Sequence, residues 1–159
     1  MKKMFTLLLS FSSLLALSQP TYSWLKGFGG SGNDQTTCVT TDASGNVYVC
    51  GYFTGTVDFD PSASTYMLTS TGNIDAFFAK FSDAGNLVWA KSFGSTTGDA
   101  ANRIVLDNLN NIYLTGSFSG TADFDPSVAV ESRASNGSND IFIAKFDQNG
   151  NYLNVTTVG

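Results

Sequence analysis

A ten-residue segment of this chain occurs twice, 65 residues apart, and this interval limits the folds that the chain can adopt. The segment Phe53–Ser62 returns as Phe118–Ser127, and eight of its ten residues are identical. Aligning residues 24–88 with residues 89–153 needs no gap and leaves 26 of the 65 positions identical. A gapless match of this kind is typical of tandem copies of one structural unit. The sequence therefore predicts two equal modules.

The composition favours strands and tight turns within each module. Charged residues make up 13% of the chain, about half the usual share, and aromatic residues also make up 13%. The chain contains 16 glycines. Long surface helices normally carry many charged residues, and disordered chains are poor in aromatic residues. The composition therefore argues against both.

The first 18 residues resemble a secretory signal peptide. Lys2 and Lys3 precede an apolar run at Phe5–Leu17, and we expect cleavage before Gln19. A membrane anchor is the alternative, but the run is shorter than the roughly 20 residues that span a bilayer. The sequence thus predicts a protein that is secreted or held on the outer cell surface, with no membrane span after cleavage.

The mature chain is acidic. Removal of Lys2 and Lys3 would take the formal charge from -5 to -7. Nucleic acids and anionic lipids bind basic surfaces, so neither is an expected partner.

Alternation of apolar residues places four principal strands in each unit. Two loops, residues 42–46 and 82–86, have the composition of hairpin turns, and Gly45 stands where a positive φ is needed. In the second unit Asn110 replaces this glycine, and asparagine is the next most tolerant residue there. In the first unit the predicted strands are Thr37–Thr41, Val47–Phe53, Ala76–Phe81 and Leu87–Phe93, with short strands around Thr56–Phe59 and Tyr66–Thr69.

The third predicted strand of each unit is apolar on both faces, which indicates a sheet that is covered on both sides. Stacked propeller blades have this property. The predicted fold is therefore all-β, with two tandem four-stranded antiparallel β-propeller blades. A closed propeller needs at least four blades. We expect either a fragment or a chain that associates with further blades or with itself to cover its outer faces.

These observations divide the chain into four parts. Residues 1–18 are the predicted signal peptide, residues 19–88 the first blade and residues 89–153 the second. Residues 154–159 are predicted to begin a third unit, with Gly159 at the place of Gly94.

The units also resemble a known repeat family. The resemblance rests on Trp-x-Lys-x-Phe-Gly at residues 24–29 and 89–94, on Asp-x-x-Gly-Asn-Val-Tyr-Val-x-Gly at residues 42–51, and on the Asp-Phe-Asp-Pro element. Together they are similar to the bacterial β-propeller repeat called SBBP. The resemblance implies four-stranded blades in a protein that is secreted or held on the outer cell surface of a bacterium. It implies no established enzymatic activity.

The two cysteines suggest a disulfide. Centring the first hairpin on Ser44 places Cys38 opposite Cys50. Directly opposed Cβ atoms lie about 4.5–5.5 Å apart, which is close to the reach of a disulfide. Secretion would supply an oxidising compartment. The sequence therefore predicts a cross-strand disulfide, with two small buried thiols as the alternative.

Two pairs of aspartates recur in the repeated segment, and three interpretations are open. Residues two apart in a strand share a face, so each pair could present two carboxylates together. Such pairs could bind calcium or hydrolyse glycosides. The interpretation that the sequence favours is structural, because aspartate before proline opens turns. The residues concerned are Asp58, Asp60, Asp123 and Asp125.

Other conspicuous residues have structural interpretations as well. Recurrence at the repeat period favours packing between blades over sugar stacking for Trp24, Trp89, Tyr48 and Tyr113. Lys80 and Lys145 are expected either to extend over apolar neighbours with the charged end in solvent or to pair with an aspartate of their own unit.

The chain has no histidine, and no nucleophile elbow or phosphate loop is found. The sequence therefore predicts no enzyme and no cofactor, with calcium as the one alternative left open. It predicts a secreted scaffold, adhesion or binding module whose partner is a glycan or a surface protein. The alternative is a fragment of a larger secreted propeller enzyme acting on polysaccharides.

Overall fold

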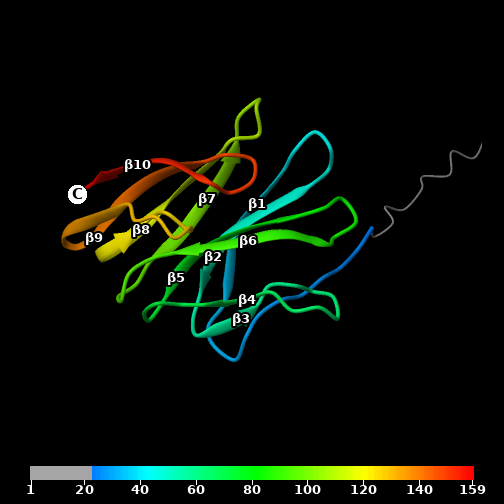
Figure 1. Cartoon of the computed structure of the whole chain (residues 1–159), viewed down its shortest axis with the longest axis horizontal. Coiled ribbons are helices and arrows are strands. Elements are labelled where there is room, and N and C mark those ends of the chain that lie inside the picture. Colours follow the sequence, from blue (N-terminus) through cyan, green and yellow to red (C-terminus); the bar gives the residue numbers. More distant parts are fainter. Residues whose placement is uncertain (1–22) are drawn as a thin grey trace, which may run out of the picture.

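The computed structural model describes residues 23–159, which form ten β-strands and no helix. Most of these strands belong to two four-stranded antiparallel sheets that lie side by side (Figure 1). The predicted all-β class with two propeller-like blades is therefore confirmed, and the two sheets do not close into a ring. The first blade has the order β1 (Gln35–Thr41), β2 (Val47–Phe53), β5 (Asp75–Phe81) and β6 (Leu87–Phe93). The second has the order β7 (Ala100–Leu106), β8 (Ile112–Asp123), β9 (Ser132–Phe146) and β10 (Tyr152–Val158).

The predicted unit boundaries stay predictions, and they can be placed on the strands. The boundary between residues 88 and 89 falls inside β6, and residues 154–158 lie in β10. The 65-residue period itself holds, because β7 and β8 begin 65 residues after β1 and β2. A repeat period has no intrinsic starting point, so only hydrogen bonding between strands shows where each sheet begins. The predicted signal peptide, residues 1–18, lies outside the described residues.

The segment between the hairpins differs between the two blades. In the first blade it holds a separate two-stranded sheet of β3 (Thr56–Asp58) and β4 (Met67–Thr69). In the second blade the equivalent residues extend β8 and β9, with a register shift between Ser119 and Thr121. The short strands predicted around residues 56–59 and 66–69 are thus present.

The tight hairpin loops share one hydrogen-bonded geometry. The Asp42 carboxylate accepts hydrogen bonds from the backbone N–H of Ser44 and Asn46 and from the Asn46 side chain, at 2.8–3.0 Å. Gly45 has φ 81°, and Asn110 at the equivalent position has φ 60°. The turn prediction is therefore confirmed at both positions. The same pattern of aspartate and asparagine recurs at Asp107 with Asn111 and at Asp147 with Asn151.

Each blade has one face rich in phenylalanine, which we call the phenylalanine face. It carries Phe53, Phe77 and Phe81 in the first blade and Phe118, Phe142 and Phe146 in the second. Segment 24–28, which we call the N-terminal segment, lies on this face of the first blade, where Phe28 packs against Phe59, Phe77 and Phe81. Phe93 of β6 packs on the second blade in the same way, against Phe124, Phe142 and Phe146.

The other side of each blade, which we call the opposite face, carries Tyr48, Cys50 and Phe78 in the first blade. These residues share one buried cluster with the phenylalanine face of the second blade. The Phe78 and Phe146 rings have centroids 4.4 Å apart. Trp89 contacts both Tyr48 and Phe78. Packing between blades was predicted for these aromatic residues, and the interface confirms it for Trp89 and Tyr48.

Candidate binding site

The connection between the two blades, residues 94–99, builds the edge of a cleft. It lies alongside the residues just before β5, where Asn73 and Ile74 donate backbone hydrogen bonds to the Thr97 carbonyl. The Asp99 N–H in turn donates to the Ile74 carbonyl at 2.9 Å. These bonds fix the connection against the first blade and bring Asp99 to the start of β7.

Asp99 is buried and fully engaged in hydrogen bonds. One carboxylate oxygen accepts bonds from the Ser95 N–H at 2.6 Å and the Ser95 hydroxyl at 2.9 Å. The other accepts a longer bond, 3.4 Å, from the Ser119 N–H on β8. Asp99 therefore ties the connection to the second blade.

Asp75, at the start of β5, is a second buried aspartate at this junction. It accepts hydrogen bonds from the N–H of Thr71 at 2.9 Å and of Gly72 at 3.4 Å. Burial raises the pKa of both Asp75 and Asp99, and the nearby Asp75 charge raises that of Asp99 further. A pair of buried carboxylates with raised pKa values is a feature of many functional sites, but structural networks show it too.

A cleft of about 240 Å³ opens beside this junction. Its lining comes from both blades and from the connection, and it is rich in hydroxyl and amide groups. The Ser119 hydroxyl is held by bonds to the Thr97 hydroxyl at 2.9 Å and the Gly98 carbonyl at 3.2 Å. Such a surface can donate and accept hydrogen bonds without carrying a free charge. The lining residues are Tyr52, Ile74, Gly98, Asp99, Ala100, Ser117, Ser119 and Asn139.

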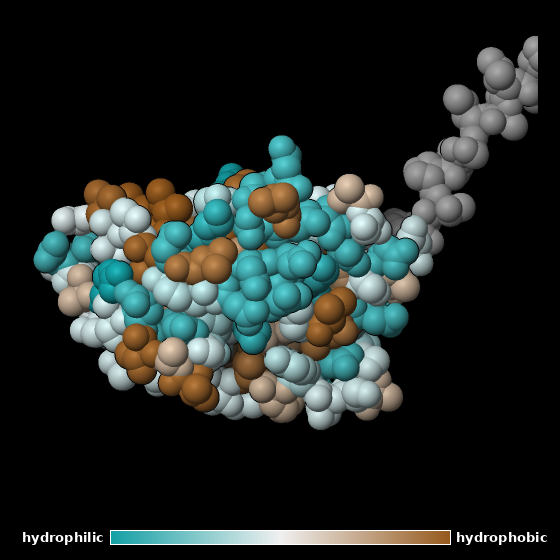
Figure 2. All heavy atoms as spheres, turned by 45° about the horizontal axis from the view of Figure 1, so that its top comes forward, coloured by the Kyte–Doolittle hydropathy of each residue, from teal (hydrophilic) through white to brown (hydrophobic). Residues whose placement is uncertain are grey.

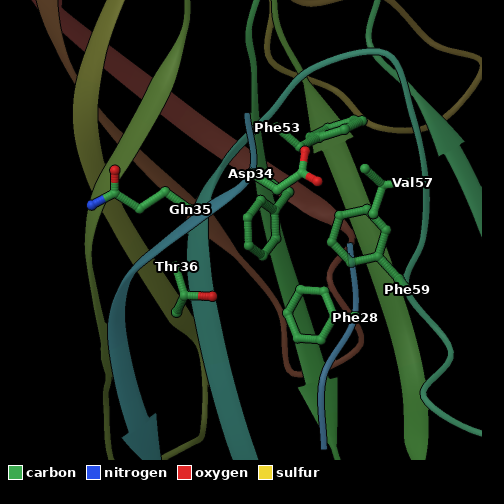
Figure 3. A pocket seen from close by; sticks show the side chains of 8 residues that line it. Phe28, Asp34, Gln35, Thr36, Phe53, Val57 and Phe59 are labelled. Carbon is green, nitrogen blue, oxygen red and sulfur yellow. The ribbon is translucent and has the colours of Figure 1, made fainter. Parts of the chain in front are cut away.

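Asp34 is the equivalent of Asp99 in the first blade. It accepts bonds from the Gly30 N–H at 2.7 Å and the Thr54 N–H at 3.3 Å. It borders a small cavity of about 40 Å³, and Figure 3 shows its carboxylate beside Phe53 and Val57. Because no blade covers this side, Asp34 is only partly buried, whereas Asp99 is buried.

The four aspartates predicted as possible metal ligands lie outside this cleft and bind their own backbone. Asp58 accepts bonds from the N–H of Asp60 at 3.0 Å and of Tyr66 at 2.8 Å, and Asp60 accepts one from Ser62. Asp123 and Asp125 repeat this arrangement with residues 125, 131 and 127. Within residues 23–159 no group of three or more His, Cys, Asp or Glu side chains could hold a metal ion. Calcium binding stays a prediction, which a calcium titration followed by thermal melting would check.

The disulfide prediction needs correction. Cys38 and Cys50 are register partners, as predicted, but both are free thiols. Their sulfur atoms face different carbonyls of β7, Ile104 for Cys38 and Ala101 for Cys50, each at 3.9 Å. Burial raises the pKa of the Cys50 thiol to about 11, so this thiol is not reactive. The two cysteines pack in the contact between the blades, against β7.

The repeated lysines follow the second of the two predicted arrangements and pair with an aspartate of their own blade. Lys80 lies 3.9 Å from the Asp42 carboxylate and 5.0 Å from the centre of the Tyr48 ring. Lys145 makes the same two contacts with Asp107 and Tyr113. Each lysine therefore braces the hairpin loop of its own blade.

The sequence analysis did not single out the Asp75 and Asp99 pair as a site. A signal was present, because Asp99 matches Asp34 and Asp75 matches Asp140 at the repeat period. The two pairs lie far apart along the unit, however. Their meeting depends on how one blade packs against the next.

Comparison with known proteins finds a distant similarity. The chain is 27% identical over 113 residues to an uncharacterized WD repeat-containing protein, L264, of Acanthamoeba polyphaga mimivirus. The match covers 62% of this chain but only 8% of that protein. A WD repeat relative agrees with propeller-type blades. No family model matches the chain, so the resemblance to the SBBP repeat stays a prediction.

The membrane prediction can be examined only from residue 23 onward. Among these residues there is no helix whose length and hydropathy would suit a membrane crossing.

Proposed function

We propose that this protein is a secreted, non-enzymatic binding module that holds a protein ligand in the cleft between its two blades. The observation that carries the proposal is the construction of this cleft from both blades and their connection. A shared aromatic core holds the blades together, so the cleft is preformed. Preformed concave sites with a few convergent polar groups are the usual places for ligands.

The chemistry of the lining favours an uncharged polypeptide segment. Ser117 and Asn139 can pair with peptide N–H and C=O groups, and Tyr52 adds an aromatic surface. The aromatic residues for which stacking on sugars was the alternative interpretation do not line the cleft. These are Trp24, Trp89, Tyr48 and Tyr113.

The hydrogen bonding of the aspartates supports a binding role over catalysis. Asp75 and Asp99 hold backbone and serine groups in place, and the aspartates of the repeated segment hold turns. General acid or base catalysis needs a carboxylate that can reach a substrate proton. The expected signal peptide places the binding event outside the cell.

A screen of a phage-displayed random peptide library against the purified protein would test the proposal. We expect enrichment of uncharged polar peptides. Asn139→Ala should weaken their binding at least tenfold, because Asn139 is exposed at the cleft. Asn108→Ala is the matched control, since Asn108 is exposed in a hairpin loop away from the cleft. Equal losses in the two variants, or no enrichment, would contradict the proposal.

Two further assays on the same preparation address the alternatives. Binding on a glycan array that Asn139→Ala abolishes would replace the protein ligand by a glycan. Release of reducing ends from polysaccharides would favour the alternative of a larger propeller enzyme.

A further inference from the structure

The phenylalanine face is covered by a blade in the second blade but not in the first, so the first blade has an open apolar surface. The second blade's phenylalanine face is covered, and Ile104 there is 1% exposed. Val39, its equivalent in the first blade, is 60% exposed. A cavity of about 240 Å³ lies beside it. The lining residues are Trp24, Lys26, Phe28, Thr36, Val39, Val47, Val49 and Phe81.

The opposite face is covered in the first blade but exposed in the second. Ile141 and Ile143 are 56% and 51% exposed, whereas Ala76 and Phe78 at the equivalent positions are fully buried. A cavity of about 230 Å³ lies on this face, lined by Arg103, Val105, Tyr113, Leu114, Thr115 and Ile143. Figure 2 shows hydrophobic side chains gathered at the end of the molecule that β9 and β10 form.

The sizes of the side chains on the two open faces are matched. Between the blades, the opposite face contributes Cys38, Cys50, Ala76 and the larger Phe78, and the phenylalanine face contributes Ile104, Ile112 and Leu114. On the open faces the first three of these positions hold the larger Arg103, Thr115 and Ile141, and the Phe78 position holds the smaller Ile143. The positions that face them hold the smaller Val39, Val47 and Val49. Exchanges that conserve the total volume of a core are the ones that packing tolerates. The open faces are therefore suited to each other.

We infer that a second copy of this chain docks head to tail on the first. Its second blade would place Ile141 and Ile143 over Val39 and Val49 of its neighbour, as the first blade places Ala76 and Phe78 over Ile104 and Leu114 within one chain. Such a contact is heterologous, and repetition closes a ring when the rotation allows it. Propellers have about four to eight blades, and each docked copy would add its blades to the same stack.

The N-terminal segment competes with this docking. It occupies on the first blade the place that residues 89–93 occupy on the second, and β10 of the docked copy would need the same place. β10 is paired with β9 through six residue pairs, whereas residues 24–28 form no strand. The segment is held by Phe28 and by one hydrogen bond from the Trp24 indole to the Asp83 carbonyl. β10 of the docked copy would therefore displace the N-terminal segment.

Sedimentation velocity of the purified protein over a range of concentrations tests the docking. We expect association that weakens at least tenfold in Val39→Lys and in Ile143→Lys, because each buries a positive charge in a contact that already holds Arg103. Both residues are exposed in one chain, so circular dichroism should show unchanged folding. Val128→Lys, in the exposed loop between β8 and β9, is the control and should associate normally. A monomer at all concentrations would overturn the inference.

Mixing the two variants tests the head-to-tail arrangement. Each keeps one intact face, so an equimolar mixture should form a 1:1 complex that grows no further. Self-association of either variant alone at the normal affinity would show a symmetric contact and overturn this arrangement.

A substitution in the N-terminal segment tests the competition. Trp24→Ala should strengthen association at least threefold, because it loosens the competing segment. Leu25→Ala is the control, since the Leu25 side chain is exposed and should leave association unchanged. Weaker association of a folded Trp24→Ala protein would contradict the competition.

Discussion

At the scale of single residues, Gly94 shows how the junction between the blades limits the side chains it accepts. A Cβ on Gly94 would lie 2.9 Å from the Asp75 carboxyl carbon and 2.9 Å from an Asp99 oxygen. Contacts this short require a shift of at least one carboxylate, and both are held by backbone hydrogen bonds. Glycine at this position is therefore a condition for the two buried aspartates.

We predict that Gly94→Ala lowers the free energy of unfolding by about 1–3 kcal/mol, the range for overpacking. Gly98→Ala is the matched control in the same connection, because no atom lies within 4 Å of a Cβ there. Urea unfolding of the two variants and the parent would measure the difference. Equal stability of Gly94→Ala and Gly98→Ala would show that the carboxylates move freely.

At the scale of elements, the pKa values of aspartates are lowered in the hairpin loops and raised at the junction between the blades. At Asp42, burial disfavours ionisation, but hydrogen bonds from Asn46 and Ser44 and the nearby Lys80 outweigh it and lower the pKa. The pKa of Asp147 is lowered in a similar way, and hydrogen bonds from Asn111 lower the pKa of Asp107. At the junction between the blades, burial raises the pKa of Asp75, at the start of β5, and of Asp99, in the connection.

These opposite shifts predict a maximum in stability at acidic pH. Ionised Asp75 and Asp99 cost stability, so the free energy of unfolding should rise as the pH falls through their raised pKa values. The loop aspartates contribute stability above their ordinary pKa of 3.8, and it is lost as the pH falls through their lowered values. Urea unfolding at a series of pH values, with carboxyl titration by NMR, would check both. A carboxyl pKa of Asp99 below 3.8 would contradict the first part.

At the scale of the whole molecule, the same position in the two blades has two different surroundings. Phe78 on β5 is buried between the blades, and its ring packs against Phe146. Ile143, 65 residues later on β9, lies on the open face of the second blade. The contribution of such a position to stability therefore depends on the neighbouring blade.

Phe78→Ala should lower the free energy of unfolding by about 3–5 kcal/mol, as for other buried phenylalanines. Ile143→Ala, the equivalent substitution, should cost less than about 1 kcal/mol, because little buried surface is lost. Both are to be measured by urea unfolding at a concentration where the protein is monomeric. A similar cost at the two positions would mean that the blades do not stabilise each other through this contact.

Much of the fold could be predicted because its determinants are local. Alternation of apolar residues set the limits of β2 and β6, and turn chemistry set the hairpins at Gly45 and Asn110. The aspartates of the repeated segment bind nearby backbone N–H groups, so their turn geometry could be inferred from spacing. Such features need only residues that are neighbours along the chain or across one hairpin.

The sequence by itself determined the repeat, the strands, the turns and the register that sets Cys38 opposite Cys50. Only the tertiary structure decided that these thiols stay free, that Asp75 meets Asp99, and that one face of each blade is left open. The physical reason is that all three depend on the packing of one blade against the next. Many positions in this contact differ between the two units, so the repeat could not reveal them. Cys38 and Arg103, or Phe78 and Ile143, share a place in the blade but not a neighbour.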